Sequence, residues 1–450
     1  MPEPSDLEHK LILTVNCGSS SIKFKLYTAE SLRVIFSGSA SNVEQKGLKP
    51  VIKYVVHHNE HGHEEEEKHQ EEEDETMPYE DVFERIIALL EEKQLQHFAS
   101  QEHERPRDLI KLVTHRVVHG GRQKEPMVLW PGHEEGMDLL DRLAQFAPLH
   151  NHRSIVVVKV CLEHLPASHQ VLCYDTLFHQ TLAPKIYTYP IAPPEHDTGV
   201  PLRRYGMHGL SYSAILRLVS SYLGKKPEDT NLIVAHLGSG ASMCLIRSGK
   251  SEDTTMGLSP LEGLPGGTRT GSVDPVLIYH HTPSSVEIIN YKGTDITKAE
   301  LVLNTQGGFQ ALTGTSDFGK IISNLPKDFD PFGSEISADS KYELTYALFL
   351  DRLLNFLGAY MNKLLGHPTL PSHLDALVFS GGIGEHAVRL RADVARYLGW
   401  LGCELDVQAN ESDSDDVVIK ISTSASKIPL VVCKTDEEQQ CALMSKPFLF

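Results

Sequence analysis

The alternation of hydrophobic and polar positions in residues 11–26 predicts a strand, a tight turn and a second strand. Leu11 to Val15 form an apolar run, which breaks at Asn16-Cys17-Gly18-Ser19-Ser20-Ser21 before apolar and polar residues alternate to Leu26. One glycine and three hydroxyl side chains let this turn present N–H and O–H groups to a phosphate. An ordinary serine-rich hairpin turn explains the same residues, and the lysine and spacing of a P-loop are missing.

The same pattern recurs in the second half of the chain. Residues 232–246 again show an apolar run, a Gly-Ser-Gly turn and a second apolar run, so that Gly238 corresponds to Gly18 and His236 to Asn16. A third buried run ends in Gly381-Gly382-Ile383-Gly384. Two matching halves with glycine loops predict an α/β protein of duplicated, actin-like fold, the architecture of sugar kinases and chaperone ATPases. This fold by itself specifies no reaction.

Further periodic segments divide the chain into two domains. Helical spacing of apolar residues predicts amphipathic helices over 79–96 and 342–365, the second capped by Gly366, and a helix that stops at Pro148 and leaves 149–151 on a loop. A stretch rich in Pro and Gly at 190–201 suits a boundary. We expect an N-terminal domain of residues 1–190, completed by a helix at 435–450 with Thr435 as its N-cap, and a second domain of residues 191–434.

Residues 57–76 differ in composition from the rest of the chain. They hold ten acidic residues, five histidines and one lysine, a net charge of −9. Because such a run offers little apolar surface to bury, we expect a solvated, mobile acidic insert. The histidines could bind a metal, although a tract without fixed geometry is weak support for that alternative.

Composition narrows the functional classes. The chain has 450 residues and a formal net charge of −18, which argues against a nucleic-acid partner or an anionic membrane. No apolar run approaches the ~20 residues that span a bilayer, and the N-terminus lacks the hydrophobic core of a signal peptide. Seven cysteines, an odd number without a C-x-x-C pair, fit a reducing compartment. We therefore expect a cytoplasmic protein.

Two predicted strands carry charged residues that need an explanation. Arg116 lies inside the apolar run 112–118, where a guanidinium requires an anion or a partner. A structural salt bridge and a bound ligand are both open at this point. Asp175 and His179 follow the buried run 171–174, at the carboxyl end of a strand, where α/β proteins collect polar chemistry.

Taken together, ten motifs resemble the acetate and propionate kinase family across nearly the whole chain, in the family's order. They are Asn16-Cys17-Gly18-Ser19-Ser20-Ser21-Ile22-Lys23, His115-Arg116-Val117-Val118-His119-Gly120-Gly121, Ala147-Pro148-Leu149-His150-Asn151, Asp175-Thr176-Leu177-Phe178-His179-Gln180-Thr181, Arg204-Tyr205-Gly206-Met207-His208-Gly209, Pro260-Leu261-Glu262-Gly263, Gly267-Thr268-Arg269-Thr270-Gly271, Ser316-Asp317-Phe318, Gly382-Ile383-Gly384-Glu385 and Thr435-Asp436-Glu437-Glu438.

The resemblance implies reversible, direct in-line transfer of a phosphoryl group between ATP and acetate, giving acetyl phosphate and ADP, in a cleft between the two domains. It implies Mg²⁺ or Mn²⁺ as cofactor, ATP/ADP as co-substrate, a short-chain carboxylate as partner substrate, and a homodimer through the C-terminal domain. A carboxylate is already a nucleophile, so the reaction needs positioning and charge stabilisation rather than a general base.

The resemblance also implies a role for each matching residue. The catalytic residues are Arg116, Asp175, His208 and Arg269. The nucleotide and phosphate residues are Asn16, Ser19, Ser21, Lys23, His236, Gly238, Gly240, Asp317, Gly382, Ile383 and Gly384. The acyl pocket is formed by Val118, Leu149, Met207 and Pro260. The metal is held by Asn16 and Glu437.

The sequence departs from the family pattern at a few positions, and rival functions stay open. The family usually has Asn at Ser239, Arg at Gly319, Asn at His386, His at Tyr212 and Phe at Met207. These differences concern base preference and acyl chain length. The alternatives are a propionate or butyrate kinase and an actin-like ATP-binding scaffold without carboxylate kinase activity.

Overall fold

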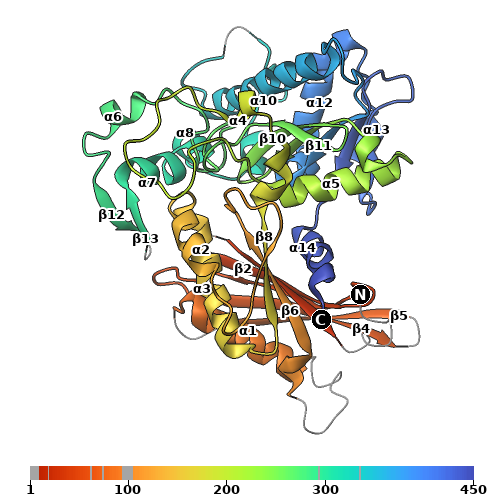
Figure 1. Cartoon of the computed structure of the whole chain (residues 1–450). Coiled ribbons are helices and arrows are strands. Elements are labelled where there is room, and N and C mark those ends of the chain that lie inside the picture. Colours follow the sequence, from red (N-terminus) through yellow and green to blue (C-terminus); the bar gives the residue numbers. More distant parts are fainter. Residues whose placement is uncertain are drawn as a thin grey trace. The chain divides into compact units, whose positions relative to one another are not determined.

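A computed structural model describes residues 10–18, 20–60, 63–72, 76–93, 105–291, 294–333 and 336–450. The chain divides into two compact units, the first comprising Met1–Leu177 with Asp436–Phe450 and the second Phe178–Thr435. The division therefore falls before the proline-rich stretch at 190, where the sequence placed it. The fold class is confirmed, because each unit is a mixed α/β structure with its own large sheet (Figure 1).

The first unit is built on an eight-stranded sheet of order β5-β4-β3-β2-β1-β6-β8-β7. Strands β1, β6 and β8 are parallel, and the remaining neighbours are antiparallel. The strands are β1 Leu11–Cys17, β2 Ser21–Thr28, β3 Val34–Ser41, β4 Val51–Glu60, β5 His63–Glu72, β6 Ile110–Val117, β7 Met127–Leu129 and β8 His169–Tyr174.

Helices cover this sheet on both faces. They are α1 Tyr79–Lys93, α2 Met137–Ala144, α3 Pro148–His164 and α14 Glu437–Ser445. Helices α1 and α3 bury the face that carries Leu11, Leu13 and Val15, whereas α14 packs on the face that carries Asn16. The expected loop at 149–151 is wrong, because Pro148 begins α3; its fixed φ and missing N–H suit the first position of a helix.

The expectation of a mobile insert at 57–76 is also contradicted. Residues up to Glu60 and from His63 to Glu72 belong to the antiparallel pair β4–β5, which extends the sheet at its edge. Backbone pairing with β3 does not depend on side-chain polarity, and Tyr54 anchors the hairpin by stacking on His69 and bonding Glu71. The acidic character of this edge strand also resists pairing with other chains.

The second unit has a six-stranded sheet of order β11-β10-β9-β14-β16-β15 and a separate ribbon β12-β13. Strand β9 is antiparallel to β10 and parallel to β14, as β1 is to β2 and β6, which confirms the duplicated pattern. The strands are β9 Leu232–Leu237, β10 Ala241–Arg247, β11 Lys250–Thr254, β12 Ile288–Tyr291, β13 Thr294–Thr297, β14 Ala376–Ser380, β15 Val418–Lys420 and β16 Leu430–Cys433.

The long helix α10 and helix α5 pack on opposite faces of this second sheet. Leu353 and Leu357 of α10 join one core with Ile233, and Ile215 of α5 joins another with Val234. The helices are α4 Pro184–Tyr187, α5 Gly209–Tyr222, α6 Leu277–His281, α7 Lys298–Thr305, α8 Gly308–Thr313, α9 Phe318–Ser323, α10 Lys341–Leu365, α11 Gly381–His386, α12 Val388–Tyr397 and α13 Val407–Glu411.

The N-cap of the last helix differs by one residue from the expected one. Asp436 rather than Thr435 caps α14, by accepting a hydrogen bond from the backbone N–H of Gln439. The carboxylate is the stronger acceptor at a helix N-terminus, where the dipole favours negative charge. Within the described part of the chain, no helix combines the length and apolar character needed to cross a membrane.

Candidate active site

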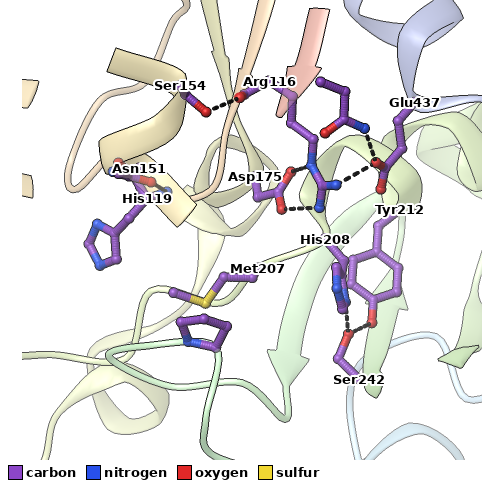
Figure 2. Close-up of polar contacts among 12 residues, drawn as sticks. Arg116, His119, Asn151, Ser154, Asp175, Met207, His208, Tyr212, Ser242 and Glu437 are labelled. Atoms are coloured by element: carbon purple, nitrogen blue, oxygen red, sulfur yellow. Dashed lines mark hydrogen bonds and ion pairs between the residues drawn. The ribbon is translucent and has the colours of Figure 1, made fainter. Parts of the chain in front are cut away.

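Arg116 is held by two carboxylates in the first unit (Figure 2). It lies near the end of β6, and its Nε and Nη2 atoms donate to Asp175 Oδ1 and Oδ2 at 3.1 and 2.8 Å. Its Nη1 atom lies 2.7 Å from Glu437 Oε2, at the start of α14. Asp175 is fully buried, whereas the side chains of Arg116 and Glu437 are 18% and 16% exposed. The two-pronged contact fixes the plane of the guanidinium while leaving part of it accessible.

Charge keeps this arginine ionised despite its burial. Burial alone lowers the pKa of Arg116, but the nearby carboxylates of Asp175 and Glu437 outweigh it and raise the pKa. Ser154 of α3 donates to the Arg116 carbonyl at 3.1 Å and so ties the strand to the helix (Figure 2). Arg116 is thus a permanently charged, oriented donor for an anion.

Asn16 and Glu438 extend the cluster along α14. The Nδ2 atom of Asn16 lies 3.2 Å from Glu437 Oε2 and 3.1 Å from Glu438 Oε1. Burial, followed by the adjacent charge of Glu437, raises the pKa of the Glu438 carboxyl. The sequence assigned the metal to Glu437 and suggested for Glu438 only a capping box with Thr435. In the structure both Glu437 and Glu438 contact Asn16, whereas Asp436 caps the helix.

The remaining sites expected in the first unit lie around the ends of β1 and β6. The backbone N–H of Gly18 donates to the Ser21 carbonyl at 2.8 Å, and Tyr79 donates to the Gly18 carbonyl. Lys23 lies opposite Asn16 in the β1–β2 register and is exposed. Ser19 lies outside the described residues. The turn therefore has the tight form that the sequence predicted, while contact with phosphate stays a prediction.

Val118 and Leu149 belong to two segments that one asparagine ties together. The Asn151 amide exchanges hydrogen bonds of 3.0 and 2.9 Å with the backbone N–H and carbonyl of His119. This brings the β6 extension carrying Val118 to the first turn of α3, which carries Leu149 (Figure 2). Both side chains are half-buried. The other two expected acyl-pocket residues, Met207 and Pro260, are buried in the second unit.

His208 is the centre of a second polar group, in the second unit. Its Nδ1 atom lies 2.8 Å from Ser242 Oγ, which also bonds the Tyr212 hydroxyl (Figure 2). The ring of His236 stands at a steep angle to that of His208, with centroids 4.8 Å apart. The φ of His208 is +59°, a left-handed conformation that costs free energy in a non-glycine residue. The strain is consistent with a functional site.

His179 supports that strained turn, and the sequence assigned it no role. Fully buried, it bonds the Met207 carbonyl through Nε2 at 3.0 Å and Ser251 Oγ through Nδ1 at 2.7 Å. Burial lowers the pKa of His179 to about 4, so the ring is neutral near pH 7. Nε2 therefore donates to the carbonyl and Nδ1 accepts from the serine. Only the position of His179 after a buried strand hinted at this function.

Arg269 lies against a glycine of the β9–β10 turn. A Cβ atom added at Gly240 would fall 2.8 Å from Arg269 Nη1 and 3.6 Å from His208 Nε2. The backbone N–H of Gly267 donates to the Ser239 carbonyl at 2.9 Å and holds the loop of Arg269 on this turn. The missing side chain at Gly240 therefore lets Arg269 and His208 approach the same backbone. Gly238 bonds the Gly240 carbonyl across the turn at 3.1 Å.

A cavity of about 720 Å³ opens beside the Gly-rich loops of the second unit. Its walls combine expected nucleotide residues with apolar side chains from α9, α12 and α13, and such a cavity is large enough for a nucleotide. The expected residues are Gly238, Asp317, Gly382 and Ile383, joined by Ser239, Gly319 and His386, three of the positions where the sequence departs from the family.

The glycines at the cavity differ in what they allow. A Cβ added at Gly382 meets nothing within 4 Å, so this position faces open space, whereas Gly384 packs on the backbone of Phe379 and is buried. Asp317 caps α9 by accepting from the Lys320 N–H at 3.2 Å, which leaves a second carboxylate oxygen for a ribose hydroxyl. Gly384 thus supports the loop without lining the cavity.

Arg391 is a further residue that the sequence did not indicate. It is 3% exposed and donates to the carbonyls of Gly384 and Glu385 and to Asn410, which lines the cavity. Burial without a carboxylate partner among these contacts lowers the pKa of the guanidinium to about 10. Arg391 lies on the buried, mostly apolar face of helix α12. Its contacts with the Gly384–Glu385 loop therefore become apparent only from the tertiary structure.

The donor set of the first unit suits a hard divalent cation. Glu437 supplies a carboxylate and Asn16 an amide oxygen, and magnesium is commonly held by one or two protein carboxylates together with phosphates and water. Among the described residues, no group of three or more His, Cys, Asp or Glu side chains forms a closed metal cage. The residues therefore fit a cation that is shared with a phosphorylated ligand.

Comparison with known proteins places this chain beside one group of enzymes. Residues 11–443 match the sequence model of the acetokinase family. A probable acetate kinase of Cryptococcus neoformans is 43% identical over 437 residues, 97% of either chain. The structure of a propionate kinase from Francisella tularensis aligns with a TM-score of 0.77 at 30% identity, covering 97% of this chain and 98% of that one. Porphyromonas gingivalis acetate kinase aligns at 0.74 and 27%, covering 98% and 100%.

Proposed function

This chain belongs to the acetokinase family, and from that premise we propose that it transfers the γ-phosphoryl group of ATP reversibly to acetate. A carboxylate oxygen of acetate forms a bond to the γ-phosphorus, and the bond from that phosphorus to the bridging oxygen of ADP breaks. No proton moves, because the nucleophile is already an anion. Propionate is the alternative acceptor, since propionate kinases are among the relatives.

Arg116 supplies the donor group of the first unit in this proposal. Its guanidinium binds the carboxylate and the equatorial oxygens of the transferring phosphoryl group, where negative charge spreads in the transition state. Asp175 and Glu437 hold its plane through the contacts of 3.1, 2.8 and 2.7 Å. We assign Asp175 a positioning role, because it is fully buried behind Arg116.

His208 and Arg269 supply the donors of the second unit. The Ser242 contact at 2.8 Å fixes the ring of His208, so that Nε2 donates to a phosphoryl oxygen. The bare backbone of Gly240 lets Arg269 approach the β9–β10 turn. The residues that would contact the phosphates are Asn16, Ser19, Ser21, Lys23 and His236. The proposal requires both groups of residues to act on the same phosphoryl group during transfer.

The nucleotide occupies the cavity beside Gly382. Bare backbone at Gly382 accommodates a flat base and ribose, and Asp317 accepts from a ribose hydroxyl. We therefore propose ATP rather than pyrophosphate as donor. Mg²⁺ (or Mn²⁺) would be held by Glu437 and Asn16, where it supplies positive charge to the phosphate oxygens.

The second unit also exposes apolar side chains that support a homodimer. Val276, Tyr279, Val286 and Ile288 are 55, 59, 77 and 69% exposed within one stretch, more than isolated surface residues explain. We expect Val286→Asp to convert a dimer to a monomer in light-scattering chromatography, while Trp400→Asp, at a 79% exposed site, leaves it unchanged. The seven buried free thiols support a reducing, cytoplasmic location.

The arrangement around Arg116 carries this proposal, and an acyl-phosphate trap tests it. Purified protein is incubated with ATP, Mg²⁺ and acids of two, three or four carbons, and hydroxylamine converts any acyl phosphate to a coloured hydroxamate. We expect the highest kcat/KM for acetate. A higher value for propionate would support the alternative acceptor, and ATP binding without any hydroxamate would support a scaffold instead.

A further inference from the structure

Tyr212 is one end of a hydrogen-bonded chain that leads to His208 (Figure 2). Its hydroxyl bonds Ser242 Oγ, and the same serine oxygen lies 2.8 Å from Nδ1 of His208. Tyr212 on helix α5 and Ser242 on strand β10 are both fully buried. Tyr212 is also a position at which the sequence departs from the family pattern, and the proposed function gives it no role.

Aromatic neighbours hold the ring of Tyr212 in place. The ring of His179 stands at 74° to it with centroids 5.6 Å apart, and that of His236 stands at 67° with centroids 6.2 Å apart. Phe178 packs against it at 6.2 Å with a smaller tilt. Because the ring is enclosed in this way, its hydroxyl stays on Ser242.

The chemistry of the two hydroxyls sets the direction of the chain. Ser242 has one hydroxyl proton, which it can give either to Tyr212 or to Nδ1 of His208. A phenol is a stronger donor and a weaker acceptor than a serine hydroxyl, because its oxygen shares electrons with the ring. Tyr212 therefore donates to Ser242, and Ser242 donates to Nδ1. With Nδ1 as an acceptor, the proton of a neutral His208 ring lies on Nε2.

The charged and titratable groups around His208 favour the neutral ring. A Cβ added at Gly240 would lie 2.8 Å from Nη1 of Arg269 and 3.6 Å from Nε2 of His208, so the guanidinium stands close to the imidazole. A nearby positive charge disfavours a second one on the ring. His236 lies on another side of His208, with centroids 4.8 Å apart, and burial lowers the pKa of His179 to about 4. A neutral ring still has two tautomers, and only the contact at Nδ1 distinguishes them.

We propose that Tyr212 is a positioning residue, which acts through Ser242 to hold the proton of His208 on Nε2. In the proposed function, Nε2 donates to the transferring phosphoryl group. The opposite tautomer would turn a lone pair toward the phosphoryl oxygens and lose that contact. The tautomer itself does not depend on the proposed function, whereas its effect on the rate rests on it.

Nitrogen-15 NMR of the protein with labelled histidine tests the tautomer directly, because protonated and bare ring nitrogens have well-separated shifts. The signals of His208 are those lost in His208→Gln. At about pH 8.5, where an imidazole is deprotonated, we expect native His208 to carry its proton on Nε2 and Tyr212→Phe to show a mixture of both tautomers. Tyr346→Phe removes another fully buried tyrosine hydroxyl of the second unit, and this matched control should keep the native pattern. A native ring protonated on Nδ1, or an unchanged pattern in Tyr212→Phe, would overturn the proposal.

The acyl-phosphate assay tests the consequence for the rate. We expect Tyr212→Phe to lower kcat about 5-fold at roughly pH 8.5, the value of one neutral hydrogen bond, without a change in the KM of ATP or acetate. Toward about pH 5.5 this difference from the native chain should shrink, because an imidazolium donates from both of its nitrogens. A loss that is equal at both pH values would mean that Tyr212 has only a structural role.

A double-mutant cycle tests whether Tyr212 acts through Ser242. Ser242→Ala should lower kcat with the same pH dependence, and adding Tyr212→Phe to it should cause no further loss. Additive losses would overturn the proposed chain of contacts. The expected NMR pattern in a protein without kinase activity would count against the proposed function alone.

Discussion

Replacement of Asp175 by Asn separates a positioning role from a purely structural one. The change keeps the shape of a fully buried side chain but removes its charge and turns one acceptor into a donor. The amide then accepts from either Nε or Nη2 of Arg116, which now bond Asp175 at 3.1 and 2.8 Å, while the other N–H faces an NH₂ group. Arg116 keeps Glu437, 2.7 Å from Nη1, and can swing toward it.

The size of the effect follows from these contacts. Removing one partner of a buried ion pair costs ~3–5 kcal/mol of stability, and the lower end applies because Arg116 retains Glu437 and is partly exposed. A guanidinium turned away from its transition-state position costs about 2.7 kcal/mol or more, which is ~100-fold in kcat. Arg116→Lys should also lower the rate, because the lysine ammonium lacks the planar, two-pronged shape of a guanidinium.

Three measurements check this prediction. The hydroxamate assay gives kcat and the KM of acetate, thermal unfolding gives stability, and a magnesium titration tests for metal involvement. We expect Asp175→Asn to lower kcat by ~100-fold with an unchanged Mg²⁺ requirement. If the variant lost ~3 kcal/mol of stability but kept kcat within about threefold, Asp175 would be a structural residue and the proposed orientation of Arg116 would be wrong.

Further predictions follow from other parts of the structure. Gly382→Gln fills the open wall of the nucleotide cavity and should raise the KM for ATP at least ~10-fold with little change for acetate; a normal KM for ATP would contradict the placement of the base. Glu437→Ala should raise the Mg²⁺ concentration needed for half-maximal rate. An unchanged Mg²⁺ titration would mean that Glu437 orients Arg116 but does not bind the metal. His115 and His179 have pKa values lowered to about 4 by burial, so the unfolded chain binds more protons below about pH 6.5; stability should fall between pH 6.5 and 4, and less steeply in His115→Gln.

The parts of the fold that could be predicted are those encoded by local pattern. Apolar runs ending in glycine turns marked β1–β2, β9–β10 and β14, and helical spacing marked α10 to within a residue. The hairpin at β4–β5 could not be predicted in this way. Its strands are stabilised by the edge of β3 and by Tyr54, and the acidic composition of 57–76 conceals that support.

The candidate site shows the same division. Motifs identified Arg116, Asp175, His208 and Gly382 as important residues, but not their partners. Ser242 lies opposite His236 in the β9–β10 register, and its hydroxyl contacts His208. The separation of Ser242 and His208 along the sequence does not indicate this contact. Buried supports such as His179 and Arg391 depend on contacts formed only when distant segments pack.

The charges around Arg116 bear on the proposed role of a divalent cation. Arg116 contributes one positive charge, and Asp175 and Glu437 contribute two negative charges, so this cluster carries a net −1 before any substrate arrives. Asn16 adds no charge, and burial raises the pKa of the neighbouring Glu438 carboxyl. A cluster of net −1 repels acetate and phosphate, whereas a divalent ion on Glu437 and Asn16 changes its sign to +1. In the proposed reaction we therefore expect a divalent metal to accompany the nucleotide, because the carboxylates that orient Arg116 would otherwise oppose the binding of two anions.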